Sequence, residues 1–203
     1  MLKVNGLKNS SGVTLIELMV VISIIAIIAV IAVPQYGRFI AKNSVKRAAN
    51  DLFQNMRLAR TIAIKENRTY IMTFNETPNT FRVGFDANAN NSLMDAGDQY
   101  DGAGPVRVIT IPAEYGGDIV LGSANYAVNP PNGPNAMVIA DAAFFDFNTD
   151  GSSNQTGTIY LQDTFRGYSA CVELANSAGE TNLYLWLGSA PDNTSNTNWV
   201  ELR

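Results

Sequence analysis

Hydrophobic positions dominate the start of the chain. From Val13 to Val33 almost every position is apolar, and only Thr14, Glu17 and Ser23 interrupt the run. A helix rises about 1.5 Å per residue, so a run of this length spans roughly 30 Å, the thickness of the hydrocarbon core of a bilayer. We therefore expect a transmembrane helix over this run.

After Pro34 the pattern becomes amphipathic, and apolar residues recur at steps of three or four. Because proline lacks a backbone N–H and clashes with the preceding turn, we expect the helix to kink or melt locally there; a helix end at the membrane surface is the alternative. Residues 34–68 are predicted to continue as an amphipathic helix into a head. Its apolar stripe is expected to pack on the protein's own sheet, with a groove for a partner helix as the alternative. The stripe contains Val45, Ala49, Leu52, Met56, Ala59 and Ala63.

From Thr69 onward the pattern is that of β-strands. Short runs rich in β-branched and aromatic residues alternate with clusters of Asn, Gly, Pro and Asp, which favour turns. We expect residues 69–203 to form an antiparallel head of about seven to nine strands, with long loops at 86–105 and 122–135 and a mobile stretch at 188–197. The predicted fold class is α+β. The predicted strands are Tyr70–Phe74, Phe81–Phe85, Val106–Ile111, Ile119–Leu121, Met137–Ile139, Phe144–Phe147, Thr158–Leu161, Ala170–Leu174 and Leu183–Leu187.

Charge changes sign between the helical and the β-rich parts. Residues 34–70 carry eight basic and two acidic side chains, while residues 71–203 carry four basic and fifteen acidic ones. The chain has no His, which removes the commonest general base and metal ligand. Its one cysteine, Cys171, is expected in the core. The sequence contains no nucleophile elbow, phosphate loop or metal-ligand cluster, so we expect no catalytic residues and no enzyme.

Residues 1–12 are short and polar, with Lys3 and Lys8 and no acid. Lysines before an apolar run favour a cytoplasmic N-terminus and export of the rest. A secretory signal peptide and a plain single-span anchor are two simple interpretations. The small-residue cleavage pattern after the apolar run is poor, and a carboxylate such as Glu17 within the run costs a few kcal/mol and normally serves a function. Both observations argue against the simple interpretations.

The segment Gly12-Val13-Thr14-Leu15-Ile16-Glu17-Leu18, followed by the apolar run, resembles the class III signal of type IV pilins and type II secretion pseudopilins. The resemblance implies that a prepilin peptidase cuts after Gly12 and methylates the amine of Val13, and that Glu17, the fifth mature residue, is used in assembly. Pro34 falls where the helix of this family is often broken. Ser11 stands in place of the usual basic residue, and Val13 in place of the usual Phe.

The Glu17 carboxylate has a physical reason to seek a partner. A carboxylate buried in lipid is poorly solvated until it meets a cation. The freed amine of Val13 on a neighbouring, axially shifted subunit would supply that cation and form a charge-assisted contact. The leader must be removed first, because it occupies the amine.

A second resemblance covers much of the head. The passage Leu52-x₅-Leu58-Ala59-Arg60-x₂-Ala63-Ile64, followed by Asn67 and a strand, is similar to the GspH/FimT branch of minor pilins and pseudopilins. A later Phe-rich strand that turns at a glycine, between Phe144 and Leu161, fits the same branch. The resemblance implies a low-abundance subunit that initiates or tips a filament.

Oxygen-bearing side chains on alternate residues mark a candidate calcium site at Asp86, Asn88, Asn90 and Asp95. The loop lacks the glycine and the bidentate Glu of a common calcium loop. A second string, Asp146 to Gly151, has the glycine but no following acid. Asx-rich turns give similar strings by bonding to their own backbone, and this is the alternative interpretation.

Two functions remain open at this point. The first is a structural subunit of a type IV pilus or a type II secretion pseudopilus, with other pilins, the prepilin peptidase and an inner-membrane assembly platform as partners. Such a subunit would cross the bacterial inner membrane once, with its head in the periplasm or outside, before joining a periplasmic or cell-surface filament. The alternative is a filament-borne DNA-binding subunit. Nucleic acid needs a basic exposed surface, so the acidic head favours the structural role.

Overall fold

The computed structural model describes residues 12–100, 102, 104–122, 144–186 and 199–202. The chain divides into two compact units, residues 1–39 and a head of residues 40–203, and each is described by itself. The leader before Gly12, the strand predicted at Met137–Ile139 and the stretch predicted to be mobile at 188–197 lie outside the described residues. Most of the predicted loop 122–135 does so as well.

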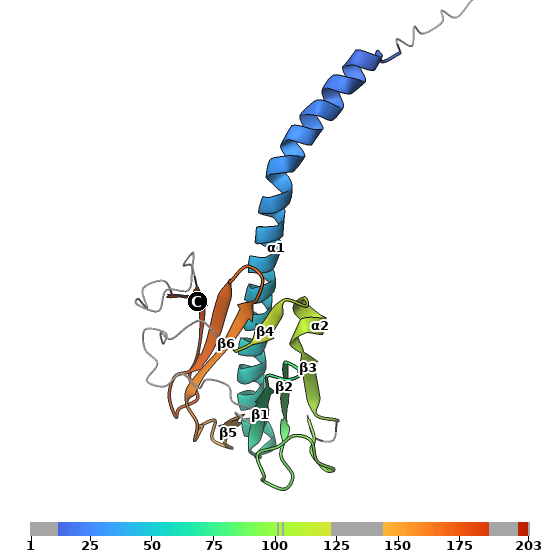
Figure 1. The fold of residues 1–203 in the computed structure, drawn as a ribbon. Helices are drawn as coiled ribbons and strands as arrows, with labels where there is room; N and C mark the ends of the chain where they lie inside the picture. The colour runs from blue at the N-terminus through green and yellow to red at the C-terminus, as the bar shows by residue number, and fades with distance from the viewer. Residues whose placement is uncertain (1–11, 101, 103, 123–143, 187–198, 203) are drawn as a thin grey trace, which may run out of the picture. The chain divides into compact units, whose positions relative to one another are not determined.

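The helix α1 extends from Leu15 to Glu66 and contributes to both units (Figure 1). It includes Pro34 in its interior, so the helix neither ends nor loses its α-helical backbone there. Its C-terminus is a Schellman motif, in which Asn67 adopts a left-handed conformation with φ 53°. The N–H of Arg68 donates to the Ala63 carbonyl at 3.2 Å and that of Asn67 to the Ile64 carbonyl at 3.4 Å.

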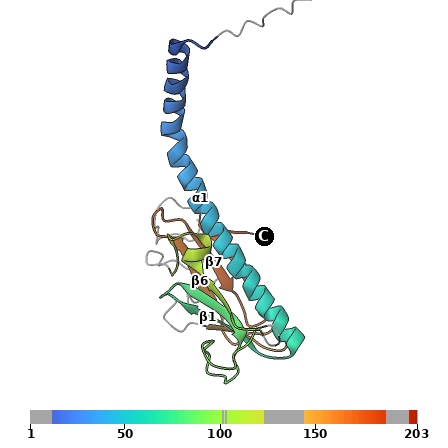
Figure 2. The ribbon, with the colours of Figure 1, turned by 90° about the vertical axis from the view of Figure 1, so that its right-hand side faces the viewer.

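Two antiparallel sheets form most of the rest of the described head. The first has the strand order β3-β2-β1-β5 and the second the order β4-β6-β7-β8-β9. Figure 2 shows the head part of α1 lying along one side of the strands. The bounds of the first sheet's strands are β1 Tyr70–Asn75, β2 Thr80–Phe85, β3 Arg107–Thr110 and β5 Phe144–Phe147. Those of the second are β4 Ile119–Leu121, β6 Gly157–Asp163, β7 Ser169–Leu174, β8 Thr181–Trp186 and β9 Trp199–Glu201.

One hydrophobic core joins the head part of α1 to both sheets. All six residues of the predicted apolar stripe are buried in it, so the prediction that the helix packs on the protein's own sheet is confirmed. Phe74 and Phe145 meet edge-on in the first sheet, with ring centroids 5.7 Å apart. The second sheet adds inward-facing aliphatic residues from β6, β7 and β8. The fold is the expected α+β arrangement of one long helix and an antiparallel head.

Two elements were not predicted. The segment Ile111–Tyr115 forms the short helix α2, so the strand expected to reach Ile111 ends at Thr110. Pro112 in the first turn and Gly116 after the last one are the features that favour this helix. The edge strand β9 pairs with β8 and was also missed.

The charge division also needs correction. Because the head begins at Ile40, most of the basic residues of the helix belong to the same unit as the acidic β-rich part. The head of residues 40–203 then carries 11 basic and 17 acidic residues, a net charge of −6, whereas residues 71–203 alone carry −11.

Candidate assembly site and the predicted sites of the head

Thr14 and Glu17 form a capping box at the start of α1. The backbone N–H of Glu17 donates to the Thr14 hydroxyl at 3.3 Å, and the backbone N–H of Thr14 donates to Oε2 of Glu17 at 3.4 Å. This reciprocal arrangement satisfies two backbone donors that a helix start otherwise leaves unpaired. The carboxylate also lies where the partial positive charge of the helix terminus favours an anion.

Around Glu17 the surface of the helix is apolar and exposed. The large apolar side chains between Val13 and Val33 are each more than half exposed. Among the described residues, α1 is the one helix whose length and composition suit a membrane span. A carboxylate in such a surface has few ways to be solvated other than its own helix start or a cation from another molecule.

Gly12 and Val13 precede the helix without packing against it. A Cβ added at Gly12 would have no atom within 4 Å, and Val13 is 73% exposed. The fold therefore places no steric demand for glycine at position 12. Any such demand would come from a protein that recognises this segment.

The predicted calcium residues converge in one turn of the 86–98 loop. Asp95 Oδ2 accepts from Nδ2 of Asn90 at 2.7 Å and from Nδ2 of Asn88 at 3.2 Å. The buried Asp86 uses both carboxylate oxygens on backbone N–H groups, those of Asn88 at 3.1 Å and Asn91 at 2.6 Å. The side-chain amide nitrogens of Asn88 and Asn90, and not their oxygens, thus face Asp95.

Asp98 belongs to the same turn, although the sequence did not single it out. It accepts from the N–H groups of Ala87 at 3.1 Å and Asp95 at 2.8 Å. Within the described residues no three acidic side chains are close enough to hold a metal ion between them. As placed, the donor set fits an Asx-rich turn, and a calcium ion would have to rotate both amides and displace their N–H groups.

The second candidate calcium string, Asp146 to Gly151, is also part of a turn that is held by side-chain oxygens. Buried Asp146 accepts at Oδ1 from the backbone N–H groups of Asn154 at 3.0 Å and Gln155 at 3.2 Å. Its role is to hold the β5–β6 turn.

Arg60 has a structural role that the sequence did not reveal. Its guanidinium reaches from α1 to two turns of the head, donating from Nε to the Gly151 carbonyl at 2.8 Å and from Nη2 to the Ala178 carbonyl at 2.9 Å. A Cβ at Gly179 would lie 2.5 Å from the Gly151 carbonyl oxygen, so the two turns approach too closely for a side chain. Arg60 therefore clamps the β5–β6 and β7–β8 turns to the helix.

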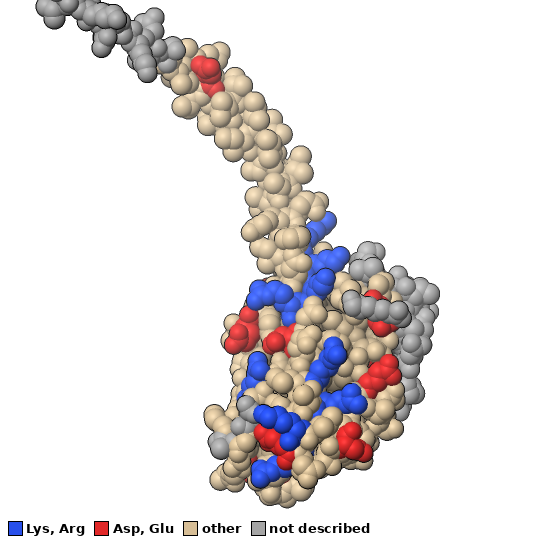
Figure 3. Space-filling model, turned by 180° about the vertical axis from the view of Figure 1, so that it is seen from behind, with Lys and Arg blue, Asp and Glu red and all other residues tan. Residues whose placement is uncertain are grey.

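On the face seen in Figure 3, Lys and Arg side chains gather over the head beside several acidic ones. The exposed side chains of Lys42, Lys46, Arg57 and Lys65 contribute to the positive charge of α1. This surface is mixed in sign, in agreement with the moderate net charge of the head.

The long N-terminal helix and the antiparallel head define a pilin-like subunit. Residues 7–33 match the prokaryotic N-terminal methylation motif, and residues 48–178 match the family described as type II transport protein GspH. The second match covers more than half of the chain, so the protein belongs to the GspH family. It is a pseudopilin-type structural subunit with a membrane-anchoring helix and a head, and subunits of this class assemble with other pilins into filaments.

Among solved structures, one similar protein is the minor pseudopilin EpsH from the type 2 secretion system of Vibrio cholerae. The match has 13% sequence identity and a TM-score of 0.45, and it covers 69% of this chain and 95% of that chain. The search of curated proteins gives no match.

Proposed function

We propose that this protein is a minor pseudopilin that helps to initiate or tip the pseudopilus of a type II secretion system. The proposal rests on one observation: the same chain contains a GspH domain and an apolar helix whose first turn is capped by Glu17. The apolar helix with Glu17 supports a filament subunit in general, and the GspH domain supports a minor one.

The proposed maturation begins at the membrane. A prepilin peptidase removes residues 1–12 and methylates Val13, and the absence of any packing at Gly12 supports a glycine kept for the peptidase. Before assembly the helix of residues 13–33 crosses the inner membrane once, with the head on the periplasmic side. Assembly then proceeds at an inner-membrane platform.

Glu17 is the proposed assembly residue. In the single subunit its carboxylate caps its own helix start at distances of 3.4 and 3.5 Å, which are long for charge-assisted hydrogen bonds. A methylated amine from a neighbour would offer a full positive charge in a low-dielectric surrounding. The exchange of a weak cap for an ion pair therefore favours the assembled state.

A structural role, without catalysis, completes the proposal. DNA capture is the alternative function, and a net charge of −6 on the head disfavours phosphate binding. The full chain in detergent micelles should then show no retention on immobilised DNA at low salt.

Deletion of the gene tests the role in initiation. Cells should secrete far less of the system's substrates and form fewer pseudopili when the major subunit is overproduced, and the wild-type chain should restore both. Normal secretion and filament number in the deletion strain would contradict the proposal. A deletion strain that forms a normal number of filaments but secretes less would contradict the role in initiation and leave the role at the tip.

A further inference from the structure

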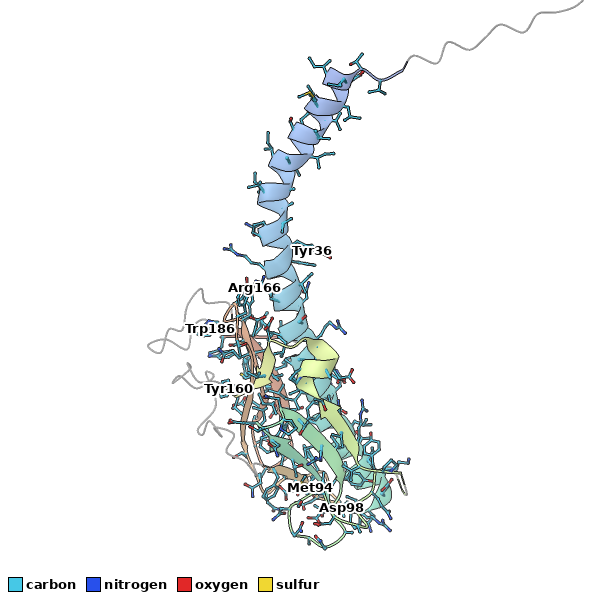
Figure 4. All side chains as sticks on the ribbon, turned by 45° about the vertical axis from the view of Figure 1, so that its right-hand side comes forward. Tyr36, Met94, Asp98, Tyr160, Arg166 and Trp186 are labelled. Carbon is cyan, nitrogen blue, oxygen red and sulfur yellow. The ribbon has the colours of Figure 1, made fainter. Side chains whose placement is uncertain are left out.

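The two faces of the second sheet differ in chemistry. Along β6, β7 and β8, alternate residues such as Ile159, Val172 and Leu183 face the core that the sheet shares with α1. The residues between them face the other way and form a separate buried layer of aromatic and polar side chains. Figure 4 shows Tyr160 and Trp186 of this outer face on the side of the sheet away from α1. The outer face is therefore buried although it is not purely apolar.

Glu173 in β7 brings a carboxylate into this outer layer. The residue is 1% exposed. Its Oε2 accepts from Nδ2 of Asn182 and from the hydroxyl of Tyr184, both at 3.3 Å, which is long for a hydrogen bond to a charged group. Its Oε1 accepts no hydrogen bond, and no described residue forms an ion pair with it. A carboxylate buried in this way costs several kcal/mol unless a cation compensates its charge.

The hydroxyl of Thr158 shares the position of this carboxylate on the sheet. Thr158 in β6 pairs directly with Glu173 in β7. The Cβ atoms of such a pair lie on the same face, about 4.5–5.5 Å apart. Thr158 is also 1% exposed, and its hydroxyl has no hydrogen-bond partner in the described structure. Two buried oxygen-bearing groups of one cross-strand pair thus lack a partner, and such groups indicate a bound water or ion.

The cations at the two ends of β7 are engaged elsewhere. Before the strand, the guanidinium of Arg166 lies over the Phe165 ring, 5.0 Å from the centroid. After it, Arg60 donates to the carbonyls of the β5–β6 and β7–β8 turns. The sequence of residues 123–143 and 187–198 contains no Lys, Arg or His, and Arg203 is the one basic residue of the chain after Arg166. A cation for Glu173 is therefore expected from outside the chain.

The charge of the site selects the kind of cation. Cys171 and Tyr184, the neighbours of Glu173 on this face, are ordinarily neutral at pH 7, so the site carries one negative charge. A monovalent cation balances that charge, whereas a divalent one would leave a positive charge uncompensated in buried surroundings. Carboxylate and hydroxyl oxygens are hard ligands, which suit hard cations.

We propose that Glu173 and Thr158 bind a monovalent alkali cation, sodium or potassium, within the outer layer of the second sheet. Oε1 of Glu173 supplies the charge and Oγ1 of Thr158 a neutral oxygen, and water completes the coordination shell. The ion links β6 to β7 through their side chains and adds to the stability of the head.

The test is thermal melting of the full chain in detergent micelles, in sodium, potassium or choline chloride at one ionic strength. The fluorescence of Trp186 and Trp199, the two tryptophans of the chain, follows the melting from the outer face itself. Sodium or potassium should raise the melting temperature by several degrees over choline, which is too large to reach buried oxygens. Ligand linkage requires the rise to grow with the concentration of the ion.

Substitutions locate the ion. Glu173→Gln should melt at one temperature in all three salts, and in choline at or above the wild type, because a buried amide carries no charge. Glu180→Gln is the matched control, since Glu180 is an exposed carboxylate in the following turn, and it should keep the wild-type response. Thr158→Val should need a several-fold higher concentration of the alkali cation for the same rise.

Three results would overturn the alkali site. Equal melting of the wild type in all three salts would show that a water or a proton satisfies Glu173. A response to sodium or potassium that persists in Glu173→Gln, or that is unchanged in Thr158→Val, would place the ion elsewhere. A response that appears only in Arg203→Met would show that an ion pair within the chain takes the place of the ion.

Discussion

The hydroxyl of Thr14 accepts the backbone N–H of Glu17, while the carboxylate of Glu17 accepts the backbone N–H of Thr14. The residue proposed to join subunits is thus also the residue that caps its own helix. The cap uses Oε2 of the same carboxylate, so it holds Glu17 in place until a neighbouring amine arrives. Capping needs only a hydrogen-bond acceptor, whereas pairing with an amine needs a charge, and substitutions can separate the two.

Glu17→Gln should keep the cap and lose the charge. We expect the variant to be cleaved and retained in the membrane like the wild type, yet to be missing from filaments or tip complexes, because an amide cannot neutralise a buried amine. Glu17→Val should behave in the same way. Immunoblots of membrane and sheared-filament fractions measure the two steps separately.

Thr14→Ala is the matched control for that experiment. It removes the hydroxyl half of the capping box and leaves the carboxylate, at a cost of about 1 kcal/mol in helix stability. Incorporation should therefore persist. If Glu17→Gln is incorporated normally while Thr14→Ala is not, the cap and not the charge governs assembly.

Arg60→Met should destabilise the head, because it keeps the aliphatic stem and removes the donors to the carbonyls of Gly151 and Ala178. We expect a loss of about 1–3 kcal/mol in the free energy of unfolding, measured by thermal melting. Arg57→Met is the control, since Arg57 stacks on the Phe53 ring at 5.5 Å and should contribute less than about 1 kcal/mol. Equal effects of the two substitutions would argue against the clamp.

The 86–98 loop should behave as an Asx-rich turn. We expect the head to melt at the same temperature in calcium, magnesium and chelator at matched ionic strength, because N–H groups already occupy both oxygens of Asp86 and Oδ2 of Asp95. Asp86→Ala should still lower the melting temperature, since it leaves two N–H groups without an acceptor. A rise confined to calcium, growing with its concentration and abolished by Asp95→Ala, would establish the predicted ion site.

Cys171 should be inert in the folded head. Burial and the nearby Glu173 carboxylate raise the pKa of its thiol well above the ordinary value, so the reactive thiolate is scarce at neutral and mildly alkaline pH. A maleimide should modify the native protein very slowly and the denatured protein at once, as followed by mass spectrometry. Rapid modification without unfolding would show that the second sheet opens easily.

The hydrophobic pattern predicts the helix and most strands, because their buried residues recur at regular intervals along the chain. The stripe from Val45 to Ala63 recurs at helical spacing, and the strands at Ile119–Leu121 and Phe144–Phe147 have the predicted bounds. The missed helix α2 spans one turn, too short for a periodic pattern, and only the positions of Pro112 and Gly116 indicate it. Strand β9 owes its place to pairing with β8, which no local pattern reports.

For the sites too, features that lie within a short segment are visible in the sequence, and contacts between distant residues are not. Glu17 was identified from the sequence through its resemblance to the pilin signal, but its capping box with Thr14 was not predicted. The side chains of the 86–98 loop were identified from their local spacing. The clamp made by Arg60 joins residues 91 and 118 positions apart, so only the tertiary structure reveals it. The division of charge was misjudged for a related reason, since the sequence does not tell where the head begins on a continuous helix.

The central claim is that this chain matures as a pseudopilin, and the intact mass of the protein extracted from membranes tests it most directly. We predict a chain that begins at Val13, lacks residues 1–12 and carries one methyl group on its amine, with the uncleaved precursor accumulating in Gly12→Glu. The Gly12→Glu head should melt like the wild type, because nothing packs against position 12. A mature chain that begins near Pro34, or one that keeps residues 1–12 in the presence of the peptidase, would contradict the account.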